Sequence, residues 1–220
     1  MTIGIGIFGG TFDPIHNGHL RLAESALKEC RLERVVFVPA ASPPHKPVSQ
    51  LTPFLHRSEM IKLALQGKRM YTYSLIEAEL PTPTYTVDTL RYLCGRFAEG
   101  TEFFFLTGLD AFLEIRTWKA YEELLKIVSF VVSERTGDFA AVKEMLAREL
   151  GYIRKNRIWQ SDDGKKPVIF LDRPPIAVSS SDIRRKIRAG DCVDGLMPDN
   201  VLAYIREHRL YTGNGHSIGQ

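Results

Sequence analysis

Short apolar runs alternate along the chain with segments whose apolar residues recur at helical spacing. The runs are rich in β-branched and aromatic residues, a pattern typical of buried strands. The predicted strands are residues 3–8, 34–38, 70–74, 102–106, 128–133 and 168–171. Apolar positions three and four residues apart indicate amphipathic helices between these runs. The predicted helices are residues 18–30, 54–65, 85–97, 121–127, 138–150, 180–189 and 199–208.

This alternation predicts an α/β fold, with a Rossmann-like, doubly wound and mostly parallel sheet that carries helices on both faces. A chain of 220 residues with 44% hydrophobic residues can bury one substantial core, so we expect a single domain over residues 1–211. The polar residues 160–166 predict a hairpin or loop, and residues 212–220 predict a disordered tail. Ligands of such sheets bind beyond the carboxyl ends of the strands, so candidate chemistry is expected there.

The charge balance is close to neutral, with 29 Lys and Arg against 26 Asp and Glu and a net charge of +3. Such a small surplus predicts neither a nucleic-acid nor a membrane partner. No apolar stretch approaches the roughly 18 residues of a membrane span, and the first residues lack the basic region of a signal peptide. Cys30, Cys94 and Cys192 form no C-x-x-C pair, which predicts neither a disulfide framework nor a zinc site. A reducing, cytoplasmic location is therefore expected.

Gly4, Gly6 and Gly9 spell G-x-G-x-x-G, the pattern of a dinucleotide-binding turn. That fingerprint requires its glycines in the turn after the strand. Gly4 and Gly6 instead lie inside the predicted strand, and the acidic residue expected about 20 positions later is poorly placed. We therefore interpret these glycines as sites of close packing between strand and helix.

The stronger signal is the turn-rich connection at residues 9–20, which reads GGTFDPIHNGHL. If Gly18 and His19 begin the helix, His16 lies beside its N-terminus and His19 in its first turn. A helix N-terminus attracts phosphate, and imidazole can donate hydrogen bonds to phosphoryl oxygens. The alternatives are structural histidines or a metal site, and two histidines without a third nearby ligand argue weakly for metal.

A second candidate lies at residues 177–184, which read AVSSSDIR and open a predicted helix. Ser179 and Asp182 have the outline of a capping box, which explains one serine of the three. Hydroxyls, helix N–H groups and the guanidinium of Arg184 would also suit a triphosphate. Both helix starts therefore predict phosphate contacts.

These two segments resemble the nucleotidyltransferase superfamily, whose signature is H-x-G-H. The fuller G-G-T-F-D-P-I-H-N-G-H is similar to the nicotinate-nucleotide adenylyltransferases, and the serine segment resembles their I-S-S-T-x-I-R with Val178 for Ile and Ser181 for Thr. The resemblance implies catalytic roles for His16, His19 and Arg184. It implies an ATP site made of Gly9, Gly10, Thr11, Phe12, His16, His19, Gly108, Asp110, Ser180, Ser181 and Arg184.

The acceptor site is predicted from three further segments. The proline-rich residues 39–46 form a rigid loop whose Lys46 can meet a phosphate, with an exposed surface lysine as the alternative. By resemblance, Thr86 in T-Y-T-V-D-T-L meets a carboxylate on the acceptor ring, and Trp118 stacks on that ring. Arg57 also matches a family position, with a structural role in its helix as the alternative.

The resemblance implies transfer of AMP from ATP to nicotinate mononucleotide, which gives deamido-NAD and pyrophosphate without a covalent enzyme intermediate. Mg²⁺ would accompany ATP. Because substrate phosphates and water normally hold this ion, no protein metal ligand is predicted. ATP and nicotinate mononucleotide are thus the expected partners, and the sequence leaves a homo-oligomer open.

Several alternatives stay open at this point. The same chemistry could use nicotinamide mononucleotide or phosphopantetheine as the acceptor, or CTP as the donor. An NAD-dependent oxidoreductase would bind NADH tightly and release no pyrophosphate. A nucleotide-binding module without catalysis would bind ATP without turning it over.

Overall fold

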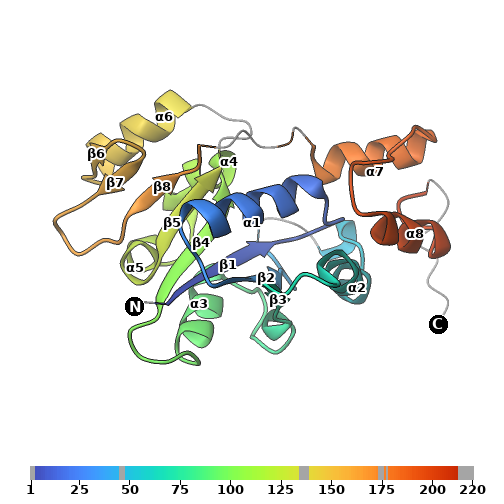
Figure 1. Ribbon diagram of the computed structural model, residues 1–220, viewed down its shortest axis with the longest axis horizontal. Helices are drawn as coiled ribbons and strands as arrows, with labels where there is room; N and C mark the ends of the chain where they lie inside the picture. Colours follow the sequence, from blue (N-terminus) through green and yellow to red (C-terminus); the bar gives the residue numbers. More distant parts are fainter. Residues whose placement is uncertain (1–2, 45–47, 134–138, 173–175, 177, 213–220) are drawn as a thin grey trace.

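The computed structural model describes residues 3–44, 48–133, 139–172, 176 and 178–212, and within these ranges one sheet of eight strands forms the centre of the molecule (Figure 1). Its spatial order is β3-β2-β1-β4-β5-β8-β7-β6. The strands are β1 (Gly4–Gly10), β2 (Arg34–Pro39), β3 (Tyr71–Tyr73), β4 (Glu102–Gly108), β5 (Ser129–Ser133), β6 (Ile153–Lys155), β7 (Ile158–Gln160) and β8 (Val168–Phe170).

Helices connect the strands and flank the sheet. In the described residues they are α1 (Asn17–Glu29), α2 (Phe54–Leu65), α3 (Thr86–Cys94), α4 (Leu109–Leu113), α5 (Tyr121–Ile127), α6 (Phe139–Glu144), α7 (Ser180–Ala189) and α8 (Asp199–Glu207). Single 3₁₀ turns occupy Val48–Gln50, Ile76–Ala78 and Ile115–Thr117. Helices α7 and α8 lie at one end of the molecule, and α6 with the β6–β7 pair lies at the other (Figure 1).

The central strands pair in parallel, and the strand order reverses beside β1. Ile7 of β1 pairs with Val36 of β2 on one side and with Phe105 of β4 on the other. The chain first extends the sheet through β2 and β3, and then returns across β1 to add β4 and β5. In doubly wound sheets this reversal opens a crevice at the carboxyl ends of the strands. Here those ends carry Gly9, Gly10 and Gly108.

Successive side chains of the strands enter two separate cores, one on each face of the sheet, as the two-residue period of a strand requires. Ile7 packs under α3, α4, α5 and α6, whereas Phe8 packs under α1, α2, α7 and α8. Phe105 and Leu106 of β4 divide between the same two cores. The expected α/β fold with helices on both faces of a mostly parallel sheet is confirmed.

Three features depart from the sequence expectations. The antiparallel hairpin β6–β7 ends at Gln160, the first residue of the polar stretch 160–166, and was not predicted, while residues 161–166 form the loop that the sequence allowed for. Its turn holds Asn156 at φ 60°, which asparagine tolerates better than most residues. The helix predicted for residues 138–150 ends at Glu144 and continues as one π-helical turn, Met145–Glu149. Helix α4 was not predicted, because five residues give too little periodicity.

The glycines of β1 serve close packing, as expected, but their neighbours differ. A methyl group on Gly6 would lie 3.0 Å from Leu32, just after α1, and 3.0 Å from Val35 of β2. The close contact is thus with the α1–β2 connection and the neighbouring strands rather than with a helix. This placement supports the rejection of a dinucleotide-binding turn.

The domain boundaries stay a prediction. The one sheet of the described residues supports a single domain over 1–211, and the tail predicted for 212–220 lies outside those residues except for Thr212. None of the helices described is long and apolar enough to cross a membrane.

Candidate active site

The two histidines of the first motif are locked together at the start of α1. His16 is the N-cap, and its Nδ1 accepts a hydrogen bond from the His19 N–H at 3.3 Å. The His19 Nδ1 accepts in return from the His16 N–H at 3.2 Å. The rings stack with centroids 3.7 Å apart and planes 19° apart. Because both Nδ1 atoms accept, each neutral ring carries its proton on Nε2 and is a donor there.

The loop that leads from β1 to His16 is held through its own carbonyl groups. Arg57 Nη1 donates to the Thr11 carbonyl at 2.8 Å, and Arg184 Nη1 donates to the Asp13 carbonyl at 2.7 Å. The hydroxyl of Ser180 donates to the Pro14 carbonyl at 2.9 Å. Donors from α2 and α7, distant in the sequence, therefore fix the chain that presents the histidines.

Each serine of the second motif has a separate task. Ser179 is the N-cap of α7, and its oxygen accepts from the Asp182 N–H at 3.1 Å. Ser180 donates to the loop carbonyl already described, and Ser181 accepts from Arg184 Nη2 at 3.3 Å. Capping thus accounts for Ser179 alone, as the sequence predicts.

The N-termini of α1 and α7 meet. A methyl group on Gly18 would lie 3.0 Å from Cγ1 of Val178, and 3.0 Å from the His16 ring. Glycine therefore fits this close approach of the start of α1 to the start of α7, where a larger residue would force its neighbours to shift. The two helix amino-ends, each a site of partial positive charge, lie on the same side of the sheet and converge.

Behind the loop lies a buried charged cluster. The Asp13 carboxylate accepts from the Tyr211 hydroxyl at 2.7 Å and from the Thr52 N–H at 3.2 Å. Arg57 is 1% exposed and also donates to the carbonyls of Thr52 and Ala40. Burial lowers the pKa of the Arg57 guanidinium, and the nearby Asp13 charge opposes that shift. Burial, followed by the Asp13 charge, raises the pKa of Tyr211.

A cavity of about 480 Å³ opens at the reversal point of the sheet. Gly9, Gly10 and Thr11 border it on the side of the β1 loop, and Thr86 and Trp118 line its other walls. The Trp118 ring meets Phe105 edge-on, with centroids 6.0 Å apart. The structure thus brings the two described acceptor candidates together in one apolar cavity that touches the histidine-bearing loop.

The end of β4 is shaped by Gly108. A methyl group there would lie 2.6 Å from the Asp110 Oδ1, so the carboxylate folds back over Gly108 and would have to move aside for a larger residue. Asp110 itself is exposed and lies outside the cavity lining. Its predicted contact with ATP stays a prediction.

The predicted site residues differ in how far their side chains are buried, which the sequence did not show. His16 is 1% exposed whereas His19 is half-buried, so His19 is the more accessible ring. The Phe12 side chain is buried beside Phe8 and Phe37, which leaves only its backbone for the predicted ATP contact. Arg57 is buried among carbonyls, which supports its structural alternative. Lys46 lies outside the described residues.

Three charged residues of the cavity wall, Glu77, Glu114 and Lys119, were not predicted from the sequence. Glu77 is 7% exposed, and its carboxylate accepts from the Ala41 N–H at 3.1 Å and from the Thr89 hydroxyl at 2.9 Å. Lys119 follows Trp118 and also lines the cavity. None of the three belongs to a motif, and proximity to Trp118 was the one signal that could have pointed to Lys119.

No group of three His, Cys, Asp or Glu side chains suited to a metal ion occurs among the residues that the structure describes. The three cysteines, Cys30, Cys94 and Cys192, are free thiols. Burial raises the pKa of Cys30 and of Cys94 to about 11, so neither is an activated nucleophile.

Comparison with known proteins agrees with this geometry. Residues 7–186 match the cytidylyltransferase-like family. A probable nicotinate-nucleotide adenylyltransferase of Desulfotalea psychrophila is 42% identical over 210 residues, which is 94% of this chain and 99% of the relative. This chain belongs to the nicotinate-nucleotide adenylyltransferase family. Another probable member, from Symbiobacterium thermophilum, is 41% identical over 217 residues, with 98% of this chain and 99% of the relative covered.

Solved structures show the same fold. The nicotinic acid mononucleotide adenylyltransferase of Plasmodium falciparum, complexed with NaAD, matches with a TM-score of 0.73 at 21% identity, over 95% of this chain and 97% of that chain. A putative nicotinate-nucleotide adenylyltransferase of Vibrio parahaemolyticus matches with a TM-score of 0.65 at 16% identity, over 97% and 98% of the chains. The family match and the curated relatives confirm the resemblance drawn from the two motifs.

Proposed function

We propose that this adenylyltransferase-family protein transfers AMP from ATP to nicotinate mononucleotide, giving deamido-NAD and pyrophosphate in NAD biosynthesis. One observation carries the proposal. The apolar cavity that holds Thr86 and Trp118 shares its wall, Gly9 to Thr11, with the loop that leads to the paired histidines. An acceptor in the cavity therefore lies next to a nucleotide at the two helix N-termini. The identity to curated relatives along nearly the whole chain supports the same activity.

On the phosphate side of the site, histidine, arginine and helix N–H groups neutralise the negative charge of the ATP phosphates. The His19 ring, backed by His16, donates from Nε2 to the α-phosphoryl group of ATP. Arg184 commits two of its five N–H donors to the Asp13 carbonyl and to Ser181, which leaves donors for the β- and γ-phosphates. The Ser180 hydroxyl proton already goes to Pro14, so the helix N-terminus of α7 supplies N–H groups at that position.

The reaction needs no base. A phosphate oxygen of the acceptor is already anionic, and it attacks the α-phosphorus of ATP in line. The new P–O bond forms as the bond to the bridging α–β oxygen breaks, and the electron pair leaves with pyrophosphate. Positioning and charge neutralisation supply the catalysis. Nucleotidyl transfer from ATP uses a divalent cation, and we assign Mg²⁺ bound to ATP as the substrate form.

The acceptor side recognises a flat ring. Trp118, held edge-on by Phe105, offers its face to the pyridine ring. The N-terminus of α3, where Thr86 is the first residue, receives the carboxylate. Lys46 stays a predicted contact of the acceptor phosphate. The free cysteines support a reducing compartment, for which we propose the cytoplasm.

Pyrophosphate release tests the proposal. The purified protein is incubated with ATP and Mg²⁺, and nicotinate mononucleotide, its amide and phosphopantetheine are compared as acceptors. We expect the fastest release with nicotinate mononucleotide and a product with the mass of deamido-NAD. Faster release with either rival acceptor would reassign the substrate. ATP binding without release from any acceptor would favour a non-catalytic module, and tight NADH binding without release would favour an oxidoreductase.

A further inference from the structure

The acceptor cavity has an unusual charge distribution. Among the described residues that line it, Lys119 is the cation, and Glu77 and Glu114 are the carboxylates. The proposed acceptor is itself an anion, with a ring carboxylate and a phosphate. A wall that carries two carboxylates repels such a ligand unless a positive charge offsets them. The position of Lys119 is therefore decisive for what the cavity accepts.

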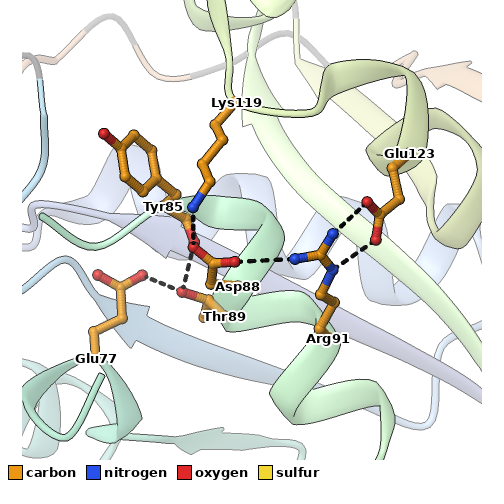
Figure 2. A network of polar contacts seen from close by, with 7 residues as sticks. All are labelled: Glu77, Tyr85, Asp88, Thr89, Arg91, Lys119 and Glu123. Atoms are coloured by element: carbon orange, nitrogen blue, oxygen red, sulfur yellow. Dashed lines mark hydrogen bonds and ion pairs between the residues drawn. The ribbon is translucent and has the colours of Figure 1, made fainter. Parts of the chain in front are cut away.

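Lys119 is held at the start of α3. Its Nζ donates to the Asp88 Oδ2 at 2.9 Å and lies 4.4 Å from the centroid of the Tyr85 ring. Figure 2 shows the Lys119 side chain reaching across to Asp88 alongside Tyr85. Tyr85 is the N-cap of α3 and makes no capping bond with its side chain. The ammonium group thus sits beside the helix end that we assign to the ring carboxylate.

Asp88 makes this lysine necessary. It lies in the first turn of α3, where its charge would oppose a carboxylate ligand at the same helix end. Its other oxygen, Oδ1, accepts from Arg91 at 3.2 Å, and Arg91 in turn holds both oxygens of Glu123 (Figure 2). The four side chains form a row of two cations and two anions with no net charge. Removal of Lys119 alone leaves the row negative.

We propose that Lys119 is a specificity-determining residue that favours an acceptor ring bearing a carboxylate over the same ring bearing a neutral amide. The inference rests on the proposed function. The ammonium attracts the acid directly and cancels the Asp88 charge, whereas the amide gains from neither effect. Because the Lys119 side chain is 48% exposed, solvent screens the interaction, and its contribution to selectivity is about two- to fivefold.

The test compares kcat/KM for nicotinate mononucleotide and for nicotinamide mononucleotide in a set of variants. We expect K119M to lower the ratio of acid to amide about two- to fivefold, mainly through a higher KM for the acid, because uniform binding is what is lost. D88N should raise the ratio, since it removes the opposing charge. The double variant should return close to the wild-type ratio, and K119R should retain it.

Controls separate this effect from a structural one. Lys28 is paired with Glu24 on α1 and does not line the cavity, so K28M should leave the ratio unchanged. Raising the salt concentration should shrink the difference between wild type and K119M, because ions screen exposed charges. A merely structural lysine would instead lower the efficiency with both acceptors equally.

The outcomes distinguish the two claims. Wild-type protein that releases no pyrophosphate with either acceptor overturns the proposed function, and this inference with it. Wild-type protein that is active on the acid, with a ratio unaffected by K119M and D88N, overturns the role of Lys119 alone. Should K119M fail to fold, D88N still decides the question, because the charge effect predicts a higher acid-to-amide ratio and a structural role predicts an unchanged one.

Discussion

Two regions of the site are built in contrasting ways. The phosphate-side loop, residues 9–16, is anchored from behind by buried groups, since Asp13 and Arg57 are each 1% exposed. The acceptor rim, made of Asp88, Arg91, Lys119 and Glu123, is held by ion pairs whose side chains are a third to a half exposed. Both regions are networks of charged groups, but one lies in the interior and the other in water.

The difference teaches which parts of the site tolerate change. A buried charge that loses its partner is strongly destabilising, whereas an exposed ion pair contributes little to stability. The loop that presents the paired histidines, to which we assign the catalytic role, is therefore rigid and intolerant of substitution. The rim can exchange charges at small cost to the fold, and so it is suited to adjusting the choice of acceptor.

The largest effect is expected from Arg57→Met. The substitution removes the donor from three backbone carbonyls and a buried cation that interacts with the Asp13 charge, so we expect a loss of about 3–5 kcal/mol in the free energy of unfolding. Urea denaturation measures it. Arg34→Met, which removes a cation from an exposed pair with Glu33, is the matched control and should cost less than about 1 kcal/mol. Equal losses in the two variants would contradict the claim that the buried charged groups stabilise the fold more than the exposed ion pairs do.

The second effect concerns the reaction itself. His19→Ala should lower kcat by roughly 10²–10³, the scale for one preorganised donor, while the protein stays folded. Steady-state pyrophosphate release and circular dichroism measure the two properties. His56→Ala serves as the control, because His56 bonds Tyr204 between α2 and α8 and does not line the cavity. Turnover within about threefold of wild type would remove His19 from the mechanism.

Tyr211→Phe gives a smaller, pH-dependent effect. Loss of the hydroxyl that donates to the Asp13 carboxylate should cost about 1.5–3 kcal/mol at neutral pH. Because the pKa of Tyr211 is raised in the folded protein, only the unfolded chain ionises above its ordinary pKa of about 10. Wild-type stability should therefore fall toward that of the variant as the pH rises above about 10. Denaturation curves at pH 8 and pH 10.5 test this, and a constant gap would contradict it.

The smallest effect is expected at the rim. Arg91→Gln breaks the paired contact with Glu123 and the contact with Asp88, yet should cost less than about 1 kcal/mol. The loss should vanish in about 1 M salt, where charges are screened within roughly 3 Å. Urea denaturation at low and high salt provides the measurement. A loss of unfolding free energy as large as that of Arg57→Met would show that the acceptor rim is also essential to the stability of the fold.

Local signals explain what could be predicted. The position of His16 beside the helix start and of His19 in its first turn follows from the glycines and apolar spacing of residues 9–30, and the structure has α1 begin at Asn17. Ser179 as the N-cap of α7 was equally local. The hairpin β6–β7 was not predictable in this way, because its strands have three residues each and pair along the edge of the sheet.

The sequence by itself determined the alternation of strands and helices, the starts of the two helices that we propose bind phosphate, and the family. These depend on backbone preferences and apolar periods that operate within about ten residues. Only the tertiary structure decided that Ser180 and Arg184 donate hydrogen bonds to the carbonyls of Pro14 and Asp13. It also decided that Lys119 lies at the start of α3. Such contacts join residues far apart in the chain, and the strand order of the sheet, which no local pattern encodes, brings them together.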